Sequence, residues 1–272
     1  MIARMKSRRI LIASLVLSTG FAEAQAAVAQ ANSPSAPAQT AAVTVPFVGY
    51  ASDGQTGPLK APVGKSVAVG IPGASAQRLA YYKAEHSPGV LAPRGWHCFS
   101  TYGSNGASIF VSPDPIDSEA VFSEDWKGFP GQVIELSFDS GGTSGRFEVA
   151  EIIARVFPAY KAFAEKVIAE GLQPASDFPV GPYPSDKLTY RGKDIVEFET
   201  PANAQGLGTD SRLQMNSSPI DGVVVISGAD TNLTHLSARV PEADSDLIPA
   251  MVGQAEKEYA DVSGPRPVES LP

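Results

Sequence analysis

Residues 132–171, with the sequence QVIELSFDSGGTSGRFEVAEIIARVFPAYKAFAEKVIAEG, carry the clearest structural signal in the chain. Apolar and polar side chains alternate over residues 132–138, which predicts a strand with one buried face. From about residue 147 to residue 170, apolar side chains recur at three- and four-residue steps, and Gly171 follows, so we expect a long helix. Pro158 lies inside this pattern. Because proline lacks a backbone donor, we expect it to kink the helix or to split it in two.

Strand patterns outside this segment come mostly in pairs joined by turn residues. Three such pairs predict β-hairpins: 96–102 with 107–111, 187–190 with 195–199, and 223–226 with 233–240. The other expected elements are a strand at 67–71, a short helix at 77–84 and a closing helix at 247–259. A doubly wound parallel sheet would require strands and helices to alternate. The pattern therefore favours the α+β class, with a mainly antiparallel sheet built from hairpins, one long kinked helix and a C-terminal helix.

Residues 1–26 show the order of features typical of a secretory signal peptide. Four basic residues precede an apolar run at 10–17, and Ala22, Ala24 and Ala26 form two small-x-small cleavage patterns. The apolar run is too short to remain as a membrane-spanning helix. We therefore expect an exported protein, located in the periplasm or in the extracellular medium.

The rest of the chain divides into three parts by composition. Residues 27–44 are mostly Ala, Gln, Ser, Pro and Thr, which predicts a flexible tether. Residues 45–262 contain no internal repeat and no second linker of this kind, so we expect a single globular α+β domain and a monomer. Residues 263–272 are expected to form a C-terminal tail.

The composition excludes several classes of partner. The chain has 21 Lys and Arg residues against 29 Asp and Glu residues, and removal of residues 1–26 makes its net charge of −8 three units more negative. An acidic chain without a basic cluster binds nucleic acid and anionic membranes poorly. No later apolar stretch approaches the roughly 18 residues of a membrane span, so we expect a soluble mature protein. Cys98 is the only cysteine, which excludes an internal disulfide, and we expect its thiol to be buried.

The glycine-rich segment between the predicted strand and helix is the main candidate for a ligand site. Glycines let backbone N–H groups converge, and a helix N-terminus carries partial positive charge. Arg146 adds a donor fork that suits a carboxylate, sulfate or phosphate. The predicted ligand-binding residues are Ser140, Gly141, Gly142, Thr143, Ser144 and Arg146. The alternative is a turn without a ligand, in which Asp139, Ser140 or Ser144 caps the helix.

A hydrolase with a serine nucleophile and a histidine base is the alternative function. The candidates are Ser140 or Ser144 as nucleophile, His97 or His235 as base, and Asp139 or Asp210 as the orienting carboxylate. Trp96-His97-Cys98 and Asp139-Ser140-Gly141-Gly142 resemble fragments of the trypsin-like serine peptidases. The 43 residues from His97 to Ser140 cannot hold two barrels, however. Phe138 to Gly141 also resembles the Asp-Ser/Thr-Gly loop of aspartic peptidases, whose chemistry requires a second carboxylate.

Aromatic residues are frequent in the central third of the chain: Tyr81, Tyr82, Trp96, Phe99, Tyr102 and Trp126. Such rings stack on sugars in exported binding modules, and they also form protein cores. The three histidines include no close pair, so we expect no metal site, and no motif indicates a cofactor. We therefore favour a binding or envelope-associated module for a small anionic or carbohydrate ligand, with a surface cleft near the 139–146 loop and the 103–106 turn.

One block of the sequence resembles a group of exported bacterial proteins of uncharacterised activity. The block is Pro93-Arg94-Gly95-Trp96-His97-Cys98-Phe99 followed by Tyr102-Gly103-Ser104-Asn105-Gly106, and the similarity continues through Gly181 and the stretch Leu207–Arg212. The resemblance implies a shared fold and export. It implies no activity.

Overall fold

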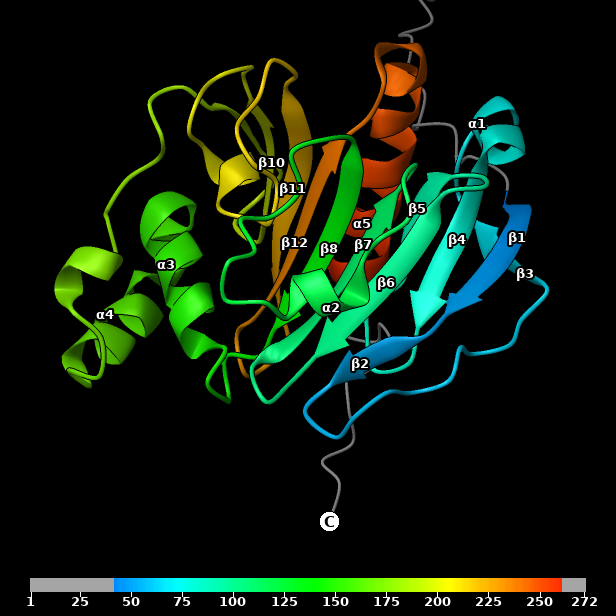
Figure 1. Ribbon diagram of the computed structural model, residues 1–272. Helices are drawn as coiled ribbons and strands as arrows, with labels where there is room; N and C mark the ends of the chain where they lie inside the picture. Colours follow the sequence, from blue (N-terminus) through cyan, green and yellow to red (C-terminus); the bar gives the residue numbers. More distant parts are fainter. Residues whose placement is uncertain (1–41, 261–272) are drawn as a thin grey trace, which may run out of the picture. The chain divides into compact units, whose positions relative to one another are not determined.

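The computed structural model describes residues 42–260, which form two β-sheets and several short helices (Figure 1). The larger sheet has the strand order β2 (Ser52–Gly54), β6 (His97–Tyr102), β7 (Gly106–Ser112), β8 (Val133–Asp139), β12 (Asn232–Arg239), β11 (Ile220–Ser227), β10 (Ile195–Thr200) and β9 (Lys187–Tyr190). The smaller sheet has the order β3 (Ser66–Val69), β1 (Val43–Tyr50), β4 (Leu79–Ala84) and β5 (Val90–Pro93). The α-helices are α1 (Gly73–Arg78), α2 (Ser118–Val121), α3 (Arg146–Val156), α4 (Lys161–Ala169) and α5 (Ile248–Ala260). Short 3₁₀ segments lie at 158–160, 175–177, 207–209 and 242–247.

Most neighbouring strands are antiparallel. The three predicted hairpins are confirmed as β6–β7, β9–β10 and β11–β12. Two pairs are parallel, namely β1 beside β4 and β2 beside β6. The α+β class and the mainly antiparallel sheet are therefore confirmed.

Strand β8 lies in the interior of the larger sheet, between β7 and β12. The prediction that it has one buried face is wrong, because its residues 133–136 are all buried. Ile134 and Leu136 face a core formed with α5 and the smaller sheet. Val133 faces a second core, formed with α3 and α4. Figure 1 shows α3 and α4 on one side of the larger sheet and α5 on the other.

The predicted long helix of residues 147–170 is not present, because the segment forms two short helices, α3 and α4. A 3₁₀ turn at 158–160 joins them. The Phe157 N–H still bonds to the Ile153 carbonyl at 3.0 Å, but Pro158 has no N–H to continue this ladder. Splitting, and not kinking, is thus the effect of this proline.

Three other boundaries differ from the predictions. The segment 77–84 is mostly the strand β4, since Leu79–Ala84 pairs with both β1 and β5, and only its first two residues belong to α1. Strand β1 begins at Val43, inside the predicted tether. The closing helix α5 begins at Ile248, after a 3₁₀ segment.

Some predictions concern residues that the structure does not describe. The signal peptide at 1–26, most of the 27–44 tether and the 263–272 tail lie outside the described residues. Within residues 42–260, no helix is both long and apolar enough to cross a membrane.

Candidate functional site

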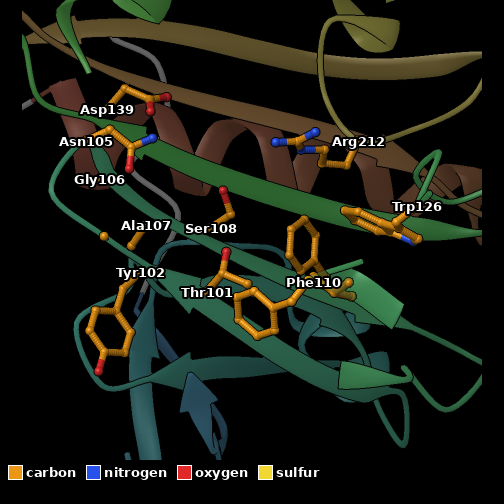
Figure 2. A pocket seen from close by; sticks show the side chains of 13 residues that line it. Thr101, Tyr102, Asn105, Gly106, Ala107, Ser108, Phe110, Trp126, Asp139 and Arg212 are labelled. Atoms are coloured by element: carbon orange, nitrogen blue, oxygen red, sulfur yellow. The ribbon is translucent and has the colours of Figure 1, made fainter. Parts of the chain in front are cut away.

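A cleft of about 270 Å³ opens over strands β6, β7 and β8 (Figure 2). Thr101 and Ser108 are partners in the β6–β7 register, and with Asp139 at the end of β8 they form a polar floor. The other lining residues are Tyr102, Gly103, Asn105, Gly106, Ala107, Phe110, Val121, Phe122, Trp126 and Arg212. The cleft therefore combines a polar floor with aromatic walls.

Asp139 is the acidic group of this cleft. Its side chain accepts a hydrogen bond from Ser137 Oγ at 3.5 Å. Burial, followed by the negative charges of Glu148 and Glu135, raises the pKa of Asp139 to about 7. A carboxyl group with this pKa exchanges a proton near neutral pH, and its carboxylate form lies in a position that favours a cation.

Two loops form the wall that carries Trp126 and Arg212. The Phe129 N–H donates to the Arg212 carbonyl at 2.7 Å, and the Gln214 N–H donates to the Phe129 carbonyl at 2.9 Å. Arg239 is only 1% exposed, and its guanidinium donates to the Gly131 carbonyl in the first loop and to the Gln214 carbonyl in the second. These bonds hold the two loops together as one wall.

Glu135 lies in β8 and anchors the same wall from below. It is almost fully buried, and its Oε2 accepts the Arg212 N–H at 2.6 Å. Burial raises the pKa of Glu135 to about 7, while the bond from Arg212 opposes this shift. Because Glu135 holds only the backbone of Arg212, the guanidinium stays exposed at the cleft, 5.9 Å from the centre of the Trp126 ring.

The predicted ligand loop, residues 140–146, uses much of its hydrogen-bonding capacity internally. Ser140 N–H donates to the Asn105 carbonyl at 2.8 Å, and Gly141 N–H donates to Asn232 Oδ1 at 3.2 Å. Thr143 N–H donates to the Ser140 carbonyl at 3.2 Å. Ser144 Oγ lies 3.3 Å from Ser104 Oγ. The expectation that Asp139, Ser140 or Ser144 caps α3 is wrong, because the N-cap residue is Gly145, which has no side chain to accept a bond from the first turn.

The glycines of this loop permit close backbone contacts. A Cβ atom at Gly141 would lie 2.2 Å from the Asp230 carbonyl oxygen, and one at Gly145 would lie 2.3 Å from the Asn105 carbonyl oxygen. The glycines that suggested an anion-binding loop are therefore explained by the close packing of the loop against its neighbours.

Arg146, the expected donor fork, is engaged by the protein itself. Its Nε and Nη2 each lie 2.9 Å from Glu170 Oε2, at the end of α4, and its Nη1 donates to the Thr143 carbonyl at 2.9 Å. The guanidinium also lies 4.4 Å from the centre of the Phe147 ring. The fork therefore ties the start of α3 to the end of α4, a contact that became available because the helix is split.

The structure separates the candidate nucleophiles from the candidate bases. His97 begins β6 and Tyr102 ends it, so roughly 17 Å of strand lies between His97 and the sheet end that carries Ser140. His235 Nε2 lies 3.1 Å from Ser237 Oγ, but both side chains are buried in β12. Burial lowers the pKa of His235 to about 4, so its imidazole is neutral at physiological pH.

Asp210, the other candidate carboxylate, contacts Tyr183 and Arg155. It accepts a hydrogen bond from the Tyr183 hydroxyl at 2.5 Å and lies 3.7 Å from Arg155 Nε. The Arg155 guanidinium in turn lies over the Tyr183 ring, 3.7 Å from its centre. This group of side chains attaches the proline-rich segment 172–186 to α3.

From the sequence, Ser108 and Arg212 were not identified as site residues, and Trp126 was named only as one of several aromatic residues. Arg212 belongs to the Leu207–Arg212 stretch that is part of the resemblance to exported bacterial proteins, and Trp126 belongs to the aromatic set, so each carried a weak signal. Ser108 carried none, because its place in the floor depends on the register of β6, β7 and β8.

Neither metal binding nor similarity to known proteins indicates a function for the cleft. Within residues 42–260, no group of three or more His, Cys, Asp or Glu side chains is placed to hold a metal ion. No protein-family model, curated protein or solved structure matches the chain.

Proposed function

We propose that this chain is an exported binding module that holds a small carbohydrate in the cleft over β6, β7 and β8. The observation that carries the proposal is the combination, in one cleft, of ring side chains with hydrogen-bonding groups on the floor and rim. Sugars present apolar C–H faces to aromatic rings and hydroxyl groups to polar side chains. Trp126 and Phe122 supply the rings, and Ser108, Asn105 and Asp139 supply the polar groups.

Export is part of the same proposal. The basic, apolar and small residues of positions 1–26 support it, as does the resemblance to exported bacterial proteins. Two parts of that resemblance contribute lining residues to the cleft: Tyr102, Gly103, Asn105 and Gly106 come from one part and Arg212 from the other. Intact-mass analysis of the secreted protein should place its first residue at Gln25 or Ala27, and retention of Met1 would contradict export.

The serine hydrolase alternative finds little support. In residues 42–260, the hydrogen-bonded contact between a histidine and a serine side chain is that of His235 with Ser237, and both are buried away from solvent. A nucleophile that substrate cannot reach does not act. We therefore favour binding.

The proposal is tested by fluorescence titration with β-1,4-linked oligosaccharides of glucose and of N-acetylglucosamine. The chain has two tryptophans, so a Trp96→Phe background makes Trp126 the sole reporter. We expect a saturable change of emission. In calorimetric titrations of the protein without this reporter change, Trp126→Ala should weaken binding by about tenfold, roughly 1.4 kcal/mol, because it removes the stacking surface.

The matched control is Tyr190→Ala. Tyr190 is an exposed aromatic residue on β9, at the opposite edge of the larger sheet from the cleft. Its loss should leave oligosaccharide affinity unchanged. Absence of saturable binding to any of the oligosaccharides, or equal losses in the two alanine variants, would refute the proposed function.

A further inference from the structure

The two ends of the cleft carry opposite charges. Figure 2 shows Asp139 and Asn105 at one end, Arg212 and Trp126 at the other, and Ser108 between them. Within the described residues, Asp139 forms no ion pair, and its side-chain hydrogen bond is the 3.5 Å contact with Ser137 Oγ. Arg212 forms no ion pair in this part of the chain either. Its backbone carbonyl accepts a hydrogen bond from the Phe129 N–H, and its backbone N–H donates to Glu135. Asp139 therefore has no counter-charge in contact with it among the described residues, whereas the Arg212 guanidinium lies over the Trp126 ring.

The surroundings of Asp139 are acidic. Glu148 on α3 and Glu135 on β8 both add negative potential at its carboxyl group, and Arg212 opposes them only weakly. Asp139 is half-buried, and a partly desolvated carboxylate without a counter-charge is unfavourable. A hydrogen-bonded cation at this position offsets that cost. A neutral hydroxyl group would satisfy a lone pair of the carboxylate but would leave its charge unbalanced.

We infer that the cleft selects an oligosaccharide of amino sugars with free amines, in which one ammonium group binds the Asp139 carboxylate at one end of the cleft while a different ring of the same chain lies against Trp126 at the other end (Figure 2). The inference rests on the proposed function and narrows its ligand class. The ammonium group can donate three hydrogen bonds. Asp139 and Asn105 offer oxygen acceptors at one end of the cleft, and Ser108 offers another nearer its middle (Figure 2). An N-acetylated amine has no charge, so it forfeits the interaction with Asp139.

The selectivity has a defined dependence on pH. The cation requires the ionised form of Asp139, and the pKa of this group is raised to about 7. The groups that act on it are Glu148, Glu135, Ser137 and Arg212. The ion pair requires an ionised Asp139 and a protonated amine. Affinity for the amine should therefore fall as the pH is lowered through about 7, because Asp139 then takes up a proton, and it should fall again at alkaline pH, because the amine then loses its proton. Affinity for neutral sugars should change less.

The experiment compares three β-1,4-linked tetramers of equal length, those of glucosamine, N-acetylglucosamine and glucose. They differ only in the group at carbon 2. Calorimetric titration of the wild-type protein at a pH just above 7 should show about tenfold tighter binding of the glucosamine tetramer. Asp139→Asn keeps the shape of the side chain and should abolish this preference. Its melting curve shows whether the variant is folded.

The control is Glu165→Gln, which removes the same charge from the exposed face of α4, outside the cleft. This variant should keep the preference, which excludes a general effect of net charge. If the neutral tetramers bind in a Trp126-dependent manner and no amine preference exists, the inference fails and the proposed function stands. If no tetramer binds, both fail. If Asp139→Asn keeps the preference, or if the wild-type preference does not fall on acidification, Asp139 is not the amine-binding group and the inference is wrong.

Discussion

Glu135 shows how a single residue connects the core of this protein to its cleft. A carboxyl group at a nearly inaccessible position is unfavourable unless it is hydrogen-bonded or protonated. Glu135 meets both conditions, since it accepts the Arg212 N–H and burial raises its pKa to about 7. The residue therefore stabilises the wall of the cleft without placing a fixed charge in the core at mildly acidic pH.

Cys98 is the second residue whose chemistry is determined by its burial. The thiol is 8% exposed, and burial raises the pKa of Cys98 above the ordinary range. Because the thiolate is the reactive form, native protein should react slowly with a thiol reagent and should react fully after denaturation. A kinetic assay with a chromogenic disulfide reagent measures both rates. Rapid labelling of the native protein would show that Cys98 is accessible and ionised.

Ile153 is a core side chain of helix α3 that should contribute to the free energy of unfolding. This residue is 1% exposed and belongs to the core between the larger sheet and α3–α4. Ile153→Ala should lower the free energy of unfolding by ~2–5 kcal/mol, because it leaves a cavity that the neighbours fill only in part. Ile153→Val, the matched smaller deletion, should cost ~0.5–1.5 kcal/mol in the same urea titrations. Equal and negligible losses would place Ile153 outside the core.

In the loop that precedes α3, we expect the loss of Arg146 to have only a small effect on stability. Arg146 pairs with Glu170, and both side chains are partly exposed, so Arg146→Ala should cost at most ~1 kcal/mol. Sulfate stabilises many proteins because it is excluded from their surface. Since the guanidinium is already engaged, the wild type and Arg146→Ala should gain equally in Tm from added sulfate. A gain confined to the wild type would restore the loop as an anion site.

Across the molecule, the carboxyl groups whose pKa values are raised should govern how stability depends on pH. Burial raises the pKa of Glu135, Asp139 and Glu256 to about 7 and that of Asp221 to about 6. The folded state then holds more protons than the unfolded state over the interval between the ordinary and the raised pKa values. Stability from these groups is therefore greatest on the acidic side and falls as the pH rises through about 7. His235 acts in the opposite direction, because its pKa is lowered to about 4.

Four carboxyl groups outweigh one histidine, so the Tm should be higher at about pH 5.5 than at about pH 8. Differential scanning calorimetry across this range measures the effect. Glu135→Gln retains an acceptor for the Arg212 N–H and removes one titrating group, so its profile should be flatter than that of the wild type. A wild-type Tm that rises steadily from acidic to alkaline pH would contradict this account.

The elements that can be predicted from the sequence are those whose signals are local. Turn residues between two strand patterns identified β6–β7, β9–β10 and β11–β12. The missing N–H of Pro158 indicated a disturbance of the helix, but it left a kink and a split open, and the long kinked helix that we expected is replaced by α3 and α4. Other features depend on pairings between distant parts of the chain. β4 became a strand because β1 and β5 flank it, and both faces of β8 are buried because α5 and α3 cover opposite sides of the sheet.

The candidate site follows the same division. Asp139 was a candidate from the sequence, but as a helix cap or the orienting carboxylate of a hydrolase, and the Ser140–Arg146 loop was expected to bind a ligand through groups that the protein turns out to use itself. Asp139, Ser108 and Arg212 share one cleft because the register of three strands and the bond from the Arg212 N–H to Glu135 bring them together, and neither feature can be predicted from local sequence. Local propensity acts over a few residues, whereas a cleft is formed by residues that are far apart in the chain.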